Sequence, residues 1–303
     1  MNSVSRRTAM EPGMREVAPG VYVKRDSRGT NLGAIVTSMG IVVVDTPMIP
    51  REARAWRAEL EAVTGKKPIY VINTDHHKGH ALGNVFFGAP AIAHMVAWKH
   101  MRGYGDNFKQ RLADRYRDKD PETARELLHL DIQLPELTFE ERMTLYLGDT
   151  VVDIIYAGGH TPASSIVYVP RARVVFAGDL VVCNMHPFMA QGSSGEWVRA
   201  LEQLKSMPID VLVPGHGEVC DKQVIDPLLD YLRVARELIR QEYLAGRSKS
   251  EAARNVLTKI IGFFPRKPSA GVKLEAKIKS GLGHVYDEIR REEEQKAASR
   301  ATA

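Results

Sequence analysis

Short apolar runs alternate with polar loops along most of the chain, and glycine or proline separates many of the runs. In the first half they predict three strands within residues 16–44, a helix over 50–63 and a further strand over 69–72. The second half repeats this order of elements. Its predicted strands cover 137–147, 151–156, 165–169, 174–176 and 211–213, with a helix over 195–206 before the last of them. Strands that alternate with helices in this way predict a layered α/β fold.

The remaining segments divide the chain into regions. We expect residues 1–15 to form a flexible arm and 16–226 to form the α/β domain, with a charged helical insertion at 95–130. The sequence pattern over residues 227–303 predicts a helical C-terminal region that packs on this domain or on a partner. The longest apolar stretch, 41–49, is interrupted by Asp45 and is shorter than the roughly 18 residues that a membrane span needs.

The charge balance indicates the kind of ligand. The chain has 42 basic and 37 acidic side chains, a net charge of +5, which favours an anionic substrate or partner. No basic stripe is interleaved with aromatic residues, so we do not expect nucleic-acid binding. Arg6 and Arg7 are not followed by the apolar segment of an export signal, and Cys183 and Cys220 are too few for a disulfide framework. These features predict a cytoplasmic protein with two thiols.

Histidine and aspartate gather in loops that directly follow predicted strands. The loops read N-T-D-H-H-K-G-H over 73–80, G-G-H-T-P over 158–162, F-A-G-D over 176–179 and P-G-H-G over 214–217. Imidazole and carboxylate groups are common ligands of transition metals, and rigid strands fix the positions of the loops that carry them. The pattern therefore predicts a metal site at the strand ends.

The order of these motifs resembles the metallo-β-lactamase-fold hydrolase superfamily, in which H-x-H-x-D-H is followed by G-x-H-T-P, G-D and a late G-H-G. The resemblance covers roughly residues 16–220, and Asp45 matches an aspartate that the family keeps beside its metal loop. It implies a four-layer αββα sandwich, with two mixed sheets face to face and metal at one edge. The insertion at 95–130 lies where members often have a lid, or it forms a packing face.

Two positions of the metal loop depart from the family pattern. Asp75 stands in place of the first histidine and Gly79 in place of the aspartate, so the motif reads D-x-H-x-G-H. The ligands that the resemblance implies for the first metal are Asp75, His77 and His160, with Asp179 as a bridge. For the second metal they are His80, His216 and Asp179, one fewer than usual. We expect one or two Zn²⁺ ions, while the carboxylate of Asp75 also suits iron or manganese.

Several residue roles stay open at this stage. Asp75 either binds the metal or accepts a hydrogen bond from a ligating imidazole. Asp75 or Asp179 replaces the missing water-orienting aspartate as general base. His186 either lines the substrate pocket or lies in a surface turn. His76 is expected to face outward, the alternative being an out-of-register ligand of the second metal.

The sequence predicts a metal-dependent hydrolase in which a metal-bound hydroxide attacks a small electrophilic substrate: an ester, thioester, lactone, amide or activated aromatic carbon. Motifs of serine or cysteine nucleophiles and of phosphate-binding loops are absent from the sequence. The alternatives are a mononuclear non-haem iron oxygenase that acts on a small thiol, and a non-catalytic subunit with a degenerate site. An oligomer is compatible with all three.

Overall fold

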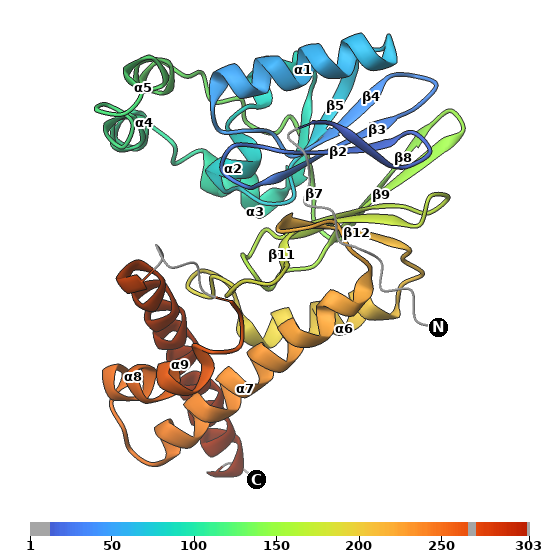
Figure 1. Ribbon diagram of the computed structural model, residues 1–303. Helices are drawn as coiled ribbons and strands as arrows, with labels where there is room; N and C mark the ends of the chain where they lie inside the picture. The colour runs from blue at the N-terminus through green and yellow to red at the C-terminus, as the bar shows by residue number, and fades with distance from the viewer. Residues whose placement is uncertain (1–12, 266–270, 302–303) are drawn as a thin grey trace, which may run out of the picture.

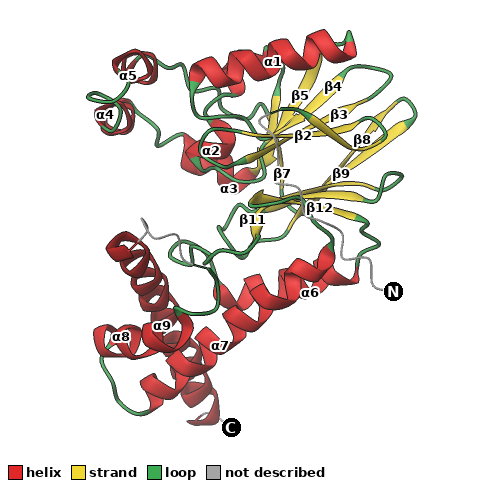
Figure 2. Ribbon diagram, viewed as in Figure 1, coloured by secondary structure: helices red, strands yellow, loops and turns green. Residues whose placement is uncertain are grey.

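The computed structural model describes residues 13–265 and 271–301, and within them two β-sheets lie face to face with helices on both outer surfaces (Figures 1 and 2). One sheet has seven strands in the order β1-β2-β3-β4-β5-β6-β7. The other has five, in the order β12-β11-β10-β9-β8. The predicted four-layer α/β sandwich with a helical C-terminal region is confirmed.

The first sheet is antiparallel from β1 to β4 and parallel from β4 to β7. Its strands are β1 Arg15–Ala18, β2 Val21–Arg25, β3 Asn31–Val36, β4 Ile41–Val44, β5 Pro68–Ile72, β6 Ala91–His94 and β7 Leu137–Phe139. Helix α1 (Pro50–Thr64) covers its outer face and buries Trp56 and Leu60 there. All four residues of β4 are buried because the strand is covered on both faces, which is why it reads as a continuous apolar run.

The second sheet contributes the other half of the core. Its strands are β8 Arg142–Leu147, β9 Thr150–Tyr156, β10 Ser165–Val169, β11 Val174–Val182 and β12 Val211–His216. Apolar side chains of both sheets, such as Val42 and Phe176, interdigitate between them. Helices α6 (Ser194–Ser206) and α7 (Ile225–Leu244) cover its outer face.

Short helices complete the first half, and longer ones form the C-terminal region. The short ones are α2 Lys78–Ala81, η1 Asn84–Phe87, α3 Met95–Met101, α4 Asp106–Asp114 and α5 Pro121–Leu128. Helices α8 (Lys249–Ile260) and α9 (Gly271–Ala301) follow η2 (Lys222–Val224) and α7, and share a hydrophobic cluster with α6 and the second sheet. The predicted packing of this region on a partner stays a prediction.

Of the predicted arm, residues 1–12 lie outside the described residues. In the described part, no helix combines the length and the apolar character that crossing a membrane requires.

The structure differs from the predicted strands at three places. The run 137–147 is two strands, because the exposed Glu140 and Glu141 carry the chain from one sheet to the other. Strand β6 is only four residues long and was not predicted. Strands β11 and β12 extend beyond their predicted ends, so Asp179 and His216 lie within strands rather than in loops. Pairing of β11 with β12 shifts register at Gly178 and then continues to His216.

Candidate metal centre

Six side chains named from the sequence meet at one edge of the sandwich. Three follow strands β5 and β9, one lies in α2, and two lie in β11 and β12. They form two groups, Asp75 with His77 and His160, and His80 with Asp179 and His216. Within each group, one potential ligand atom per residue lies within 4.8 Å of the others. The structure thus brings together all six residues for which the sequence predicted metal binding.

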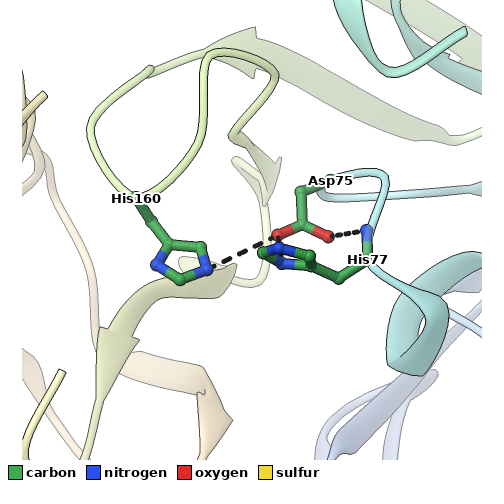
Figure 3. Close-up of side chains that lie close together, drawn as sticks. All are labelled: Asp75, His77 and His160. Carbon is green, nitrogen blue, oxygen red and sulfur yellow. Dashed lines mark hydrogen bonds and ion pairs between the residues drawn. The ribbon is translucent and has the colours of Figure 1, made fainter. Parts of the chain in front are cut away.

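In the first group, the carboxylate of Asp75 lies beside the ring of His77 and faces His160 (Figure 3). The backbone N–H of His77 donates to Asp75 Oδ1 at 2.7 Å, and Asp75 Oδ2 is 2.9 Å from His77 Nδ1. His160 Nε2 is 3.8 Å from the same Oδ2 atom. Asp75 is therefore placed both to accept a hydrogen bond from an imidazole and to act as a ligand, so neither predicted interpretation is eliminated.

Asp179 connects the two groups. Its Oδ2 atom lies 3.6 Å from His80 Nε2 and 3.6 Å from His160 Nε2, while Oδ1 lies 3.5 Å from His216 Nε2. A side chain at Gly215 would collide with Asp179 Oδ1, so the close approach of β12 to this carboxylate requires glycine there. One carboxylate thus faces histidines of both groups.

Hydrogen bonds at the far side of two rings fix which nitrogen faces Asp179. His216 Nδ1 donates to the Gly29 carbonyl oxygen at 2.9 Å, and His80 Nδ1 donates to Asp45 Oδ2 at 2.8 Å. Both Nε2 atoms are therefore left without a proton and available as ligands when the rings are neutral. Asp45 also accepts from the N–H and the hydroxyl of Thr74, at 2.8 and 2.7 Å, and its backbone adopts a left-handed conformation with φ of 59°.

His160 gives the clearest sign that the site is built to hold a cation. The ring is buried, and among the described residues neither nitrogen has a hydrogen-bond partner. Trp197 packs edge-on against the ring, and Gly159 allows this, since a Cβ there would lie 2.7 Å from the Trp197 Cα atom. Buried polar atoms without partners are rare in folded proteins, because desolvation is costly. Asp179 Oδ1 is likewise buried without a hydrogen bond. These atoms fit the histidine-and-carboxylate donor set that binds divalent transition metals.

Burial and neighbouring charges shift the pKa values of the candidate ligands. Burial raises the pKa of Asp75, but the charges of His77, His80 and His160 outweigh it and hold the pKa well below its usual range. Burial lowers the pKa of His77, yet Asp75 and Gln191 raise it to about 9. Burial prevails at His160 and lowers its pKa. The ionised Asp75 and the neutral His160 are in the protonation states that metal binding requires, whereas His77 must release a proton to act as a ligand.

Gly79 and His76 differ in their surroundings. A Cβ at Gly79 would have Thr30 Oγ1 at 3.4 Å as its nearest neighbour, so there is space for a side chain. The expectation that His76 faces outward was wrong. His76 is buried, stacks on His100 with ring centroids 4.2 Å apart, and belongs to neither group of ligands. The hydroxyl of Tyr104 donates to its carbonyl oxygen, because the helical insertion packs over this turn.

A cavity of about 700 Å³ opens over both groups. His186 lines it, and its ring packs on Tyr231 and Phe264, but its role in substrate binding stays a prediction. Gln191, which sequence reasoning did not single out, also lines the cavity and hydrogen-bonds to His77 Nε2. The cations on the cavity wall were missed as well, because they come from segments far apart in the chain. These are Arg25, Arg28, Lys78 and Lys277.

The C-terminal helix α9 holds the loop that precedes α6. His284 Nε2 donates to the Gly192 carbonyl oxygen at 2.6 Å. The buried carboxylate of Glu288 accepts from the N–H and the hydroxyl of Ser194, at 2.9 and 2.7 Å, and from Arg236 at 3.3 Å. The loop that carries Gln191 into the cavity is thus fixed by the last helix of the chain.

Comparisons with known proteins agree with this architecture. The model of the metallo-beta-lactamase superfamily matches residues 25–216. A metallo-beta-lactamase type 2 of Elizabethkingia meningoseptica is 22% identical over 204 residues, which are 65% of this chain and 73% of that protein. The solved metallo-beta-lactamase from Pontibacter korlensis has 18% identity and a TM-score of 0.55, over 73% of this chain and 98% of that chain.

One solved structure resembles more of the chain. The stereoselective inverting sec-alkylsulfatase Pisa1 from Pseudomonas sp. has 15% identity and a TM-score of 0.67, over 91% of this chain and 50% of that chain. Residues 1–226 cannot supply that share, so the likeness in fold includes part of the C-terminal helical region. Over the part that carries all six convergent side chains, this chain belongs to the metallo-β-lactamase superfamily.

Proposed function

We propose that this chain is a metal-dependent hydrolase that binds two divalent ions, Zn²⁺ in the first instance. Asp75, His77 and His160 would hold one ion, and His80, Asp179 and His216 would hold the other. When bound at these ligands, such ions lower the pKa of water towards about 7 and polarise the oxygen that gains charge during hydrolysis. The observation that carries the proposal is the position of Asp179 between the two groups, 3.5–3.6 Å from three imidazole nitrogens.

The residues of the chain orient the attacking water. Asp75 Oδ2 and Asp179 Oδ2 lie 3.8 and 3.6 Å from His160 Nε2, so water bound to an ion at this ring would have a carboxylate oxygen on two sides. Because both pKa values are low, these carboxylates stay ionised and accept a hydrogen bond throughout the working pH range. They take the orienting role that Gly79 cannot fill. The surrounding cavity has room for a small-molecule ester, thioester, lactone or amide.

The test measures metal and turnover together. Protein purified without added metal is gel-filtered and analysed for metal content, and then assayed against carboxylic esters, thioesters, lactones and an alkyl sulfate. We expect about two zinc ions per chain and hydrolysis of at least one of these classes. Asp179→Ala should lose both ions and the activity, whereas Asp153→Ala, which alters a strand carboxylate outside the cavity, should lose neither.

Two results would replace this proposal by another function. One iron per chain, with turnover of a small thiol that consumes oxygen, would indicate the oxygenase, which the carboxylate of Asp75 also suits. A metal-free chain as stable as a metal-supplemented one, with no turnover, would indicate a non-catalytic subunit.

A further inference from the structure

A second cavity of about 370 Å³ adjoins the metal cavity and shares Arg28 and Lys78 with it. Its remaining wall comes from α4 and the turn that follows this helix, including Leu112, Arg115 and Lys119. We call this cavity the side pocket. Four cationic side chains therefore surround a space that opens beside the candidate metal ligands.

The cations of the side pocket lack acidic partners. Among the described residues, no carboxylate oxygen lies within 4.0 Å of the charged nitrogens of Arg28, Lys78, Arg115 or Lys119. Arg28 bonds instead to the neutral hydroxyl of Tyr116, at 2.8 Å. The carboxylate that lines the pocket, Asp120, is already bound by Arg51 at 2.5 Å and caps α5.

On the neighbouring helix α1, by contrast, the basic side chains form ion pairs. Its arginines are each matched with a carboxylate. The pairs are Arg51–Asp120, Arg54–Glu126 and Arg57–Glu61. The arginines of α1 thus form ion pairs with carboxylates, whereas the four cations of the side pocket do not.

Like charges accumulate there although they repel one another. Lys78 is partly buried and lines the side pocket together with Arg28, Arg115 and Lys119. An anion in the side pocket would relieve this repulsion, and cavities lined by one sign of charge attract ligands of the opposite sign. Arginine forks and lysine ammonium groups are the usual donors to phosphate, sulfate and carboxylate oxygens.

We propose that the side pocket binds an oxyanion group of the substrate, at a distance from the bond that is cleaved over the metal ligands. The proposal rests on the proposed hydrolase function and specifies its substrate class: an ester or related compound that carries a second, anionic group. Several cations from separate segments suit a tetrahedral dianion, phosphate or sulfate, better than a single carboxylate. Leu112 gives the side pocket an apolar wall for the part of the substrate next to this group.

Binding of simple anions to the metal-loaded, full-length protein tests the site without turnover. Inorganic sulfate, inorganic phosphate and acetate are titrated by calorimetry into the wild type and into the double variant Arg115→Gln/Lys119→Gln. Both substituted residues line the side pocket and not the metal cavity. The control is Arg111→Gln/Lys279→Gln, which removes the same charge from exposed positions that line neither cavity.

We expect sulfate and phosphate to bind more tightly than acetate, and the first double variant to bind them about tenfold more weakly, with the control unchanged. Tighter binding of acetate would identify a carboxylate as the group recognised. Equal affinity in all three proteins, as for sulfate held by the metal alone, would overturn the proposal. So would equal weakening in both double variants, which indicates a general effect of charge.

Kinetics with two chromogenic esters separate this proposal from the proposed function. One is p-nitrophenyl butyrate, which is neutral, and the other p-nitrophenyl hemisuccinate, which ends in a carboxylate. The Arg115→Gln/Lys119→Gln variant should lose about tenfold in kcat/KM for the hemisuccinate and nothing for the butyrate. If neither ester is hydrolysed but anion binding responds as expected, the hydrolase function fails and the anion site stands. Hydrolysis of both esters with no response to the double variant refutes the anion site alone.

Discussion

Replacing Asp45 by asparagine tests how the second group of ligands is oriented. Asp45 accepts three hydrogen bonds: Oδ1 from the Thr74 N–H, and Oδ2 from the Thr74 hydroxyl and from His80 Nδ1. Asparagine has the same shape but only one acceptor oxygen. In one orientation, its amide NH₂ group faces His80 Nδ1 and makes this atom an acceptor, which moves the proton to Nε2. Nε2 is the atom that faces Asp179, and a protonated nitrogen cannot bind a metal.

In the flipped orientation, the NH₂ group faces the backbone N–H of Thr74. This buried donor then loses its acceptor, which costs about 1–3 kcal/mol. Loss of a carboxylate that orients a metal-binding histidine weakens metal affinity about 10- to 100-fold, or about 1.4–2.7 kcal/mol. Both orientations therefore lead to a similar loss at the second ion, whereas the first group does not contact Asp45.

The assay is zinc content per chain after dialysis against a series of buffered chelators. Asp45→Asn should keep the first ion at wild-type affinity and release the second at a free zinc concentration 10- to 100-fold higher. Asp153→Asn is the matched control, because Asp153 is also a buried carboxylate that accepts from a threonine hydroxyl, that of Thr144, at 2.7 Å. Wild-type affinity for both ions in Asp45→Asn would refute the reasoning.

Further predictions concern the variant loop, the C-terminal helix and pH. Gly79→Asp adds a carboxylate beside the second group, at a position where the new Cβ meets only Thr30 Oγ1, at 3.4 Å. Zinc titration should therefore show about tenfold tighter binding of the second ion; unchanged affinity would show that the new side chain does not reach it. Glu288→Ala leaves buried donors at the start of α6 without an acceptor and should lower the free energy of unfolding by about 3–5 kcal/mol in urea titrations, while the exposed Glu294→Ala should not. In metal-free protein, burial lowers the pKa of His77 but Asp75 raises it to about 9, so their ion pair stabilises the fold fully below pH 6.5 and less as pH rises through 9. Urea unfolding from pH 6 to 10 should show a loss of up to about 3 kcal/mol that His77→Ala does not share.

The layers of the fold and the convergence of the candidate ligands could be predicted because both depend on local patterns. Apolar runs define buried strands whatever their neighbours are, and the ends of strands in one sheet meet at a common edge. His77 follows β5 of one sheet and His160 follows β9 of the other, so their meeting also requires the two sheets to pack face to face, as the family resemblance implied. The family resemblance added which of the histidines form a group with Asp179.

Features that depend on pairing between distant segments could not be predicted. Arg28 and Arg115 are 87 positions apart in the sequence, and neither lies in a motif. The burial of His76 depends on the helical insertion, which packs over its turn. The extension of β11 through Asp179 requires the neighbouring strand β12, because pairing between the two strands overrides the preference of Gly178 for a turn.

The spread of the ligands along the chain determines when a metal can be bound during synthesis. Asp75 and His77 need His160, and His80 needs Asp179 and then His216, so neither group is complete in a nascent chain that has only its first half. The two halves of the chain are also joined by hydrogen bonds. The side-chain amide of Asn31 in β3 donates to the carbonyl oxygens of Pro214 and Gly217, at 2.8 and 2.9 Å. Docking of the two sheets must therefore precede stable metal binding. Chains interrupted before residue 216 cannot form the second group, although those that extend beyond residue 160 contain all three residues of the first.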